Sequence, residues 1–175
     1  GAAYDARPLH FAAAEGKLEA LCVLIEAGAY VHAIDEHGQT ALHCAAAAGS
    51  VEVASALVAA GADLEAATTE PLESKTPIQV AAVMGDMAMA SALAAAGANI
   101  NRQSEHGISC LHLFLVRACK VCIPEAPKRL QQLLDAGASV QLACATWPTL
   151  VDAMLLCIEN PRECKVPSYV PELIR

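Results

Sequence analysis

Apolar positions between residues 39 and 61 recur with the period of two short helices joined by a tight turn. Thr40 is a favourable N-cap for the first helix, because its side-chain oxygen can accept a bond from an otherwise unpaired backbone N–H. Gly49 and Gly61 follow the two apolar segments, where a left-handed C-cap favours glycine. The predicted inward positions are Leu42, Ala45 and Ala46 in the first helix and Val53, Ala56, Leu57 and Ala60 in the second. Such a unit cannot bury its own apolar face, so we expect similar units beside it.

The same pattern recurs along the chain. The tetrapeptide at residues 40–43 is echoed at residues 7–10, 76–79 and 109–112, with spacings of 33, 36 and 33 residues. The ends of the second helices repeat as an Ala-Gly-Ala segment at residues 27–29, 60–62, 96–98 and 136–138. This repetition predicts an array in which each unit contacts its neighbours and a continuous apolar layer runs between the units.

A period of about 33 residues that begins with a Thr-Pro-Leu-His type of segment resembles the ankyrin repeat. The resemblance covers the chain from about residue 5 to about residue 160. It implies an all-α fold class, an ankyrin-repeat solenoid of stacked helix–turn–helix units with short β-hairpin fingers. We expect residues 1–175 to form a single ankyrin-repeat domain, with repeats at about 5–38, 39–74, 75–107 and 108–147 and a degenerate capping segment at 148–175.

The other repeats follow the pattern with two insertions. The second finger, residues 65–75, has three extra residues and contains Pro71, which predicts a protruding, solvated loop. The fourth repeat has about seven extra residues near 119–125, so its first helix either runs longer or is followed by a loop before a second helix near Ala126. The predicted inward positions are Leu9, Ala12, Ala13, Leu18, Leu21, Leu24 and Ile25 in the first repeat, and Leu130, Leu133 and Leu134 in the fourth.

The resemblance to ankyrin repeats also indicates positions that face a concave surface and are not needed for stacking. They lie at the ends of the first helices and around the finger glycines: Glu15, Glu36, His37, Gln39, Ala48, Lys75, Val83, Met84, Glu105, His106, Ile108 and Arg117. An exposed Met beside Val and Ile makes an adaptable apolar spot, which favours partner binding. The alternative is that the long finger or the fourth-repeat insertion covers some of these side chains. Trp147 is the single Trp and either binds a partner at a fingertip or packs on the terminal helices.

Three histidines, His10, His43 and His112, occupy the ankyrin His position, where the resemblance implies bonds to neighbouring backbone that tie the repeats together. Helix pairs lie about 10 Å apart, which is too far for one metal ion to join these rings. Cys119 and Cys122 form a CxxC pair, and a structural zinc site would need two further ligands, for which the candidates are Cys144, Cys157 and Cys164. We favour ordinary thiols and expect no metal and no cofactor.

Composition narrows the class of function. Hydrophobic residues make up 55% of the chain and the mean hydropathy is +0.40, yet charged and glycine residues interrupt every apolar run, so we expect no membrane span. The formal charge of −8 argues against binding to a nucleic-acid backbone and could steer a basic partner. The eight cysteines lack the spacing of a disulfide framework, which indicates a reducing compartment, the cytosol or the nucleus.

The sequence contains none of the common catalytic motifs, such as a P-loop or a nucleophile elbow, so we do not expect an enzyme. We expect a protein–protein interaction module of an intracellular adaptor or scaffold, monomeric alone. Its concave and finger surface would bind a basic or amphipathic peptide or loop of a partner. The alternative is a substrate-recruiting or regulatory domain of a larger enzyme, such as a ubiquitin-ligase receptor.

Overall fold

The computed structural model describes residues 6–69, 74–104, 107–121 and 125–140. The chain divides into two compact units, residues 1–99 and residues 100–175. The single-domain assignment with its four repeats and capping segment remains a prediction, and residues 148–175 lie outside the described part.

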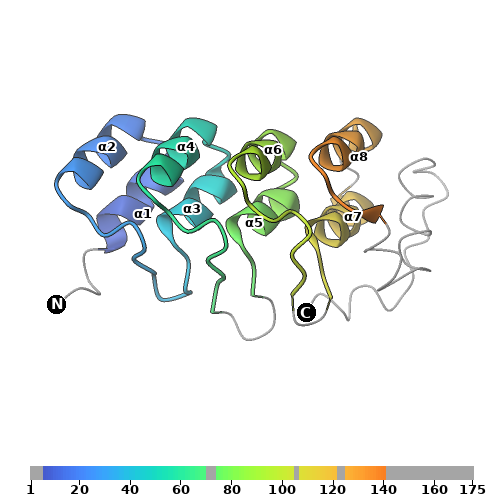
Figure 1. Cartoon of the computed structure of the whole chain (residues 1–175), viewed down its shortest axis with the longest axis horizontal. Helices are drawn as coiled ribbons and strands as arrows, with labels where there is room; N and C mark the ends of the chain where they lie inside the picture. The colour runs from blue at the N-terminus through green and yellow to red at the C-terminus, as the bar shows by residue number, and fades with distance from the viewer. Residues whose placement is uncertain (1–5, 70–73, 105–106, 122–124, 141–175) are drawn as a thin grey trace. The chain divides into compact units, whose positions relative to one another are not determined.

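Three helix pairs build the first unit (Figure 1). The first helices of the pairs, α1 (Ala6–Ala14), α3 (Ala41–Ala48) and α5 (Pro77–Met84), pack side by side and form the inner layer. The second helices, α2 (Leu18–Glu26), α4 (Val51–Ala59) and α6 (Met87–Ala95), form the outer layer, where α4 contacts both α2 and α6. The predicted fold of stacked helix–turn–helix units is therefore confirmed.

Local signals in the sequence explain where the inner helices begin and end. At the start of α3, Thr40 and His43 form a reciprocal capping box, and Gly49 closes the helix in the left-handed region with φ of 73°. The same design recurs in α5, where the Thr76 N–H donates to Gln79 Oε1 over 3.0 Å and Gly85 closes the helix with φ of 73°. Gln79 therefore performs the capping role that histidine performs in the neighbouring repeat.

The core lies between the two helix layers and between successive pairs. Leu9, Ala12 and Ala13 of α1 are buried, as predicted, and so are the long side chains Leu21, Leu42, Leu57 and Leu93. Ala41, Ala45, Ala46, Ala81 and Ala82 are buried on the inner helices, where their small side chains allow the helices to approach closely. Leu24, Ile25, Ala56 and Ala60 are half-buried. The inward prediction for Leu18 is wrong, since its side chain is 38% exposed.

The fingers are the connections α2–α3 and α4–α5, which project beyond the inner layer (Figure 1). The first finger is a hairpin-like turn closed by a single antiparallel bridge between Ile34 and Thr40. In the second finger, the Thr68 N–H donates to the Lys75 carbonyl over 3.0 Å, and the Lys75 N–H donates to Thr68 Oγ1 over 3.0 Å. The predicted hairpin fingers are therefore present in a short form, and residues 70–73 of the second finger lie outside the described part.

The second unit contains α7 (Cys110–Val121) and α8 (Ala126–Asp135), which contact each other. The first helix of this repeat does run longer, through Arg117 to Val121, and the second helix begins at Ala126 as predicted. Leu133 is buried, while Leu130 and Leu134 are half-buried. Over the described ranges, every helix is too short or too polar to cross a lipid bilayer.

Candidate functional site

The ends of the inner helices carry the first group of predicted contact residues. We call Ala14, Glu15, Ala47, Ala48, Val83 and Met84 the inner-end row, because α1, α3 and α5 pack side by side and these residues lie at the C-terminal end of each helix, Glu15 directly after α1. Glu15, Ala48 and Met84 are exposed, Met84 by 45%, and Val83 is half-buried. The row is mainly apolar, with a carboxylate at one end and a flexible thioether at the other.

The turn that follows α3 holds the middle of this row in place. Gly49 lies directly after Ala48, and a Cβ atom added to it would lie 2.6 Å from Asp86 Oδ2 of the next repeat. Asp86 in turn accepts a bond from the Met89 N–H over 3.0 Å and so caps α6. Gly49 is needed both for its positive φ and for this close approach, so the end of α3 is fixed by the loop of the repeat that follows.

The tip of the first finger is a preformed turn. Asp35 Oδ1 accepts bonds from the His37 N–H and the Gln39 N–H, each over 2.8 Å, and the Asp35 N–H donates to the Gln39 carbonyl over 2.9 Å. Glu36 and His37 are exposed at this tip, while Gln39 is half-buried. The Asp35 carboxylate forms hydrogen bonds within the turn, and the side chains of Glu36 and His37 face solvent on the backbone that these bonds fix.

The first and second fingers are packed against each other. A Cβ atom on Gly38, whose φ is 71°, would lie 2.6 Å from the Thr69 backbone nitrogen and 2.3 Å from Thr69 Oγ1. The Thr69 N–H also points at the His37 carbonyl over 3.4 Å. Any side chain at residue 38 would separate the two fingers, so the exposed tip is held by its neighbour as well as by its own turn.

Two buried imidazoles join the inner helices to the bases of the fingers, as the resemblance implied. His10 Nε2 lies 2.9 Å from the Gln39 carbonyl, and His43 Nε2 lies 3.0 Å from the Lys75 carbonyl. His43 Nδ1 accepts from the Thr40 N–H over 3.1 Å and from the Thr40 hydroxyl over 2.9 Å, so Nε2 carries the proton. Burial lowers the pKa of His43 below its ordinary value, although the bond to Lys75 opposes this shift. His43 is therefore a neutral structural residue.

The structure brings together part of the predicted contact set. Glu15, Glu36, His37, Gln39, Ala48, Lys75, Val83 and Met84 all belong to the first unit, on the inner-end row and the two fingers. Lys75 is half-buried at the base of the second finger. Ile108 and Arg117 are half-buried in the second unit, and the structure does not place them on the row. Glu105, His106 and Trp147 lie outside the described residues, so their roles stay predictions.

Ile34 is a contact candidate that the sequence analysis did not include. Its side chain is 53% exposed on the first finger, directly before the Asp35 turn. A β-branched apolar residue next to an Asp-x-x-Gly turn was the available signal, because strand positions that flank a turn alternate between covered and exposed faces. Ile34 adds an apolar side chain to a finger that is otherwise polar at its tip.

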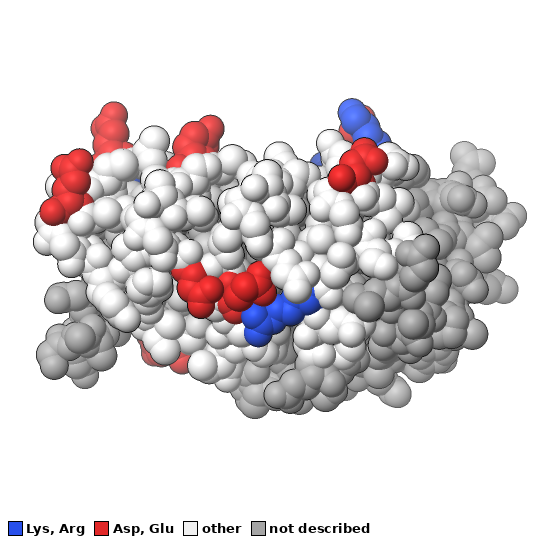
Figure 2. Space-filling view, in the orientation of Figure 1, with Lys and Arg blue, Asp and Glu red and all other residues white. Residues whose placement is uncertain are grey.

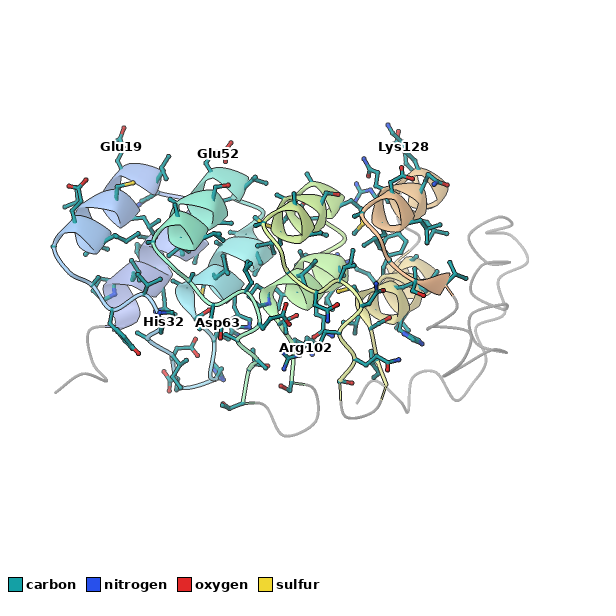
Figure 3. The ribbon with its side chains drawn as sticks, in the orientation of Figure 1. Glu19, His32, Glu52, Asp63, Arg102 and Lys128 are labelled. Carbon is teal, nitrogen blue, oxygen red and sulfur yellow. The ribbon has the colours of Figure 1, made fainter. Side chains whose placement is uncertain are left out.

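The first unit is strongly acidic. Residues 1–99 hold 12 of the 19 acidic residues and 3 of the 11 basic ones, a formal charge of −9. Figure 2 shows acidic side chains at the outer edge over α2 and α4 and again near the finger bases, and Figure 3 identifies Glu19, Glu52 and Asp63 among them. Within the described residues, no group of three or more His, Cys, Asp or Glu side chains could hold a metal ion. The CxxC side chains at residues 119 and 122 are not among them, so the zinc alternative is not tested.

Comparisons with known proteins agree with this architecture. A family model described as ankyrin repeats (3 copies) matches residues 9–104, which is more than half of the 175 residues. A comparison with curated proteins gives no match. The matched segment contains all three helix pairs of the first unit from Leu9 onward, with both of its fingers. The chain therefore belongs to the ankyrin-repeat family.

Proposed function

We propose that the inner-end row and the first two fingers bind a peptide or loop of another protein. Domains of the ankyrin-repeat family are in general protein–protein interaction modules and typically lack catalytic activity. The observation that carries the proposal is the exposure of Met84 and Ala48 beside half-buried Val83, on helix ends that are each closed by a glycine in the left-handed region. A surface ordered before binding loses little conformational entropy when a partner docks.

The charge of the first unit supports a partner segment that is basic or amphipathic. Glu15 lies at one end of the row and Glu36 at the tip of the first finger, and the unit as a whole is strongly acidic. A negative surface attracts basic segments and speeds their association, while the apolar row offers contact area for a hydrophobic side chain. We place this interaction in the cytosol or nucleus, as part of an adaptor or scaffold, in keeping with the cysteine pattern.

The test uses peptides selected from a random displayed library on the immobilised 175-residue chain. Met84→Arg should weaken the binding of the selected peptides by a factor of about 10 or more, because it replaces an apolar contact by a charge at the apolar end of the row. The melting temperature should stay nearly unchanged, since the Met84 side chain is already 45% exposed.

Ala88→Arg provides the matched control, because it adds the same charge to the same repeat. Ala88 is exposed on α6 of the outer layer and occupies the repeat position of Glu19 and Glu52, which point away from the inner layer in Figure 3. This variant should bind the peptides like the wild-type chain. Equal loss of affinity in both variants, or none in Met84→Arg, would place the binding surface elsewhere.

A further inference from the structure

The inner-end row changes its chemistry from one repeat to the next. Its last position is a carboxylate in the first repeat, Glu15, a small side chain in the second, Ala48, and a thioether in the third, Met84, and all three are exposed. A partner segment that lies along the row therefore meets an acidic end and an apolar end, which attract different side chains.

The acidic end of the row is open to a partner. Glu15 is exposed, and its carboxylate makes no hydrogen bond or ion pair with another residue in the described part of the chain. Lys17, the nearest basic residue in the sequence, instead has its ammonium 5.6 Å from the centre of the Phe11 ring. Glu36 adds a second exposed carboxylate of the same repeat, at the tip of the first finger. This end of the row therefore favours a Lys or Arg side chain.

The apolar end of the row belongs to one stripe of α5. Val80, Val83 and Met84 lie at positions i, i+3 and i+4, so they share one face of the helix. Val80 and Val83 are half-buried, and Met84 is 45% exposed. The equivalent positions on α3 carry only cysteine and alanine. A large apolar side chain of a partner therefore finds more contact area on α5 than on α3.

The third repeat also lacks the open carboxylates of the first. Asp86 is the single acidic residue between residues 74 and 99, and its carboxylate accepts a bond from the Met89 N–H over 3.0 Å. Lys75, at the base of the second finger, gives this repeat a positive charge. A basic residue of the partner is therefore favoured at the first-repeat end of the row and disfavoured at the third-repeat end.

The separation of the two ends sets the spacing of the partner's side chains. Neighbouring helices pack about 10 Å apart, so the two steps from α1 to α3 and from α3 to α5 separate the ends by about 20 Å. An extended chain advances about 3.3 Å per residue and covers this distance in about six residues. Because side chains alternate along an extended chain, residues six positions apart point to the same side, and both can face the row.

A helical segment fits the row less well. It would need about 13 residues at about 1.5 Å each, and residues 13 positions apart point in directions that differ by about 140°. A helix is also about 10 Å wide, whereas the row is only two residues deep at each helix end. A helix that turned both side chains toward the row would place them about 11 residues apart instead.

We propose that the partner segment crosses α1, α3 and α5 in extended form, with a Lys or Arg side chain at Glu15 and a large apolar side chain on Met84, about six residues apart. This register rests on the function proposed above, since the same row binds the segment. It adds the conformation of the segment and the kind of side chain that lies at each end.

Peptides selected from a random displayed library on the 175-residue chain test this register. The selected sequences should share a basic residue and a large apolar residue about six positions apart, in either order along the peptide. A recurring spacing of about 11 positions would show a helical segment and overturn the register. The absence of a recurring pair would overturn it as well.

Double-mutant cycles then assign each side chain of a selected peptide to one end of the row. Glu15→Gln should weaken binding about 3-fold at about 0.05 M salt, and it should have no effect once the basic residue of the peptide is replaced by Gln. Met84→Ala should weaken binding about 5-fold or more and should depend in the same way on the apolar residue of the peptide. Coupling of the basic residue to Met84 instead of Glu15 would overturn the register.

Glu52→Gln is the matched control, because it removes the same charge from the same unit. Glu52 is exposed on α4 of the outer layer and points away from the inner layer (Figure 3), so this variant should bind the peptides like the wild-type chain. Equal weakening by Glu15→Gln and Glu52→Gln would show that net charge alone attracts the peptides, and would overturn the register. Each of these failures leaves the binding function itself in place, because Met84→Arg and Ala88→Arg test it separately.

Discussion

Leu57 on α4 provides the strictest test of how the array is held together. Its side chain is fully buried, and α4 contacts α2 on one side and α6 on the other. Leu57→Ala removes three carbon atoms from this layer without changing helix propensity much. The lost transfer free energy is about 2.4 kcal/mol, at about 0.8 kcal/mol for each carbon.

A cavity adds to this cost, because helices on both sides of α4 limit how far the layer can collapse. If about half of the removed volume, roughly 40 Å³, stays empty, the cavity adds about 1 kcal/mol. Leu57→Ala should therefore lower the free energy of unfolding by about 3–4 kcal/mol. Leu24→Ala, the same change one repeat earlier, should cost only about 1 kcal/mol, because Leu24 is half-buried and water can fill the space.

Equilibrium unfolding in urea, followed by circular dichroism, measures both values. The slope of the free energy against urea concentration must be the same in all three proteins, since a changed slope would show that repeats unfold separately. Equal costs for the two variants would refute the argument that burial in this array comes from the neighbouring repeats. A loss of less than about 1 kcal/mol for Leu57→Ala would show that Leu57 does not lie in a buried apolar layer between the helices.

Three further predictions follow from single side chains. Burial lowers the pKa of His43, so the unfolded chain binds more protons and the free energy of unfolding should fall as pH drops below about 6.5. His43→Gln, which copies Gln79, should reduce this dependence of stability on pH, as measured by thermal melts between about pH 5 and about pH 8. His32→Asn should raise the free energy of unfolding by about 0.5–1.5 kcal/mol, by giving the Asp63 N–H an acceptor, and a loss of stability in urea titrations would contradict it. Burial, and to a smaller extent the charge of Asp35, raises the pKa of the Cys44 thiol to about 11. Iodoacetamide should therefore label Cys44 about 100-fold more slowly in the folded than in the unfolded chain, which peptide mass spectrometry can measure.

The reasoning behind His32 comes from the next two repeats. Glu65, at the same position, accepts a bond from the Asn99 N–H over 2.7 Å, and Asn101 accepts one from the Ser139 N–H over 2.8 Å. His32 instead lies edge-on to Tyr30, with ring centroids 5.5 Å apart. An asparagine there can reach the backbone of the following repeat in the way that Asn101 does.

Much of the fold follows from the sequence because its signals are local. Thr40 and Gly49 mark the limits of α3 through capping chemistry that needs no distant partner, and the period of the repeats dictates which helices become neighbours. The buried positions Leu9 and Leu21 follow from helical spacing for the same reason. The fold of a repeat sequence can be predicted because the local helix signals and the packing of the repeats favour the same structure.

The remaining features depend on contacts between repeats, which spacing does not reveal. Leu18 has the right helical position to be buried, yet its burial requires a helix pair in front of α2. The packing of Thr69 against Gly38 arises from the course of the second finger, whose length alone was evident from the sequence. Ile34 was missed because its exposure depends on where the finger points. Site residues at the tips of loops are therefore less predictable than helix faces.

The contact between Gly49 and Asp86 has a consequence for how such chains change by duplication. The space that a Cβ atom would need on Gly49 is taken by a side chain of the following repeat, and Gly16 meets Ser50 in the same way, with a separation of 2.6 Å in each case. A repeat copied to a new position must therefore have a glycine after its first helix, to fit the repeat that follows, and a short polar residue before its second helix, to fit the repeat that precedes it. Tandem copying preserves both halves of this match, whereas recombination between unlike repeats breaks it.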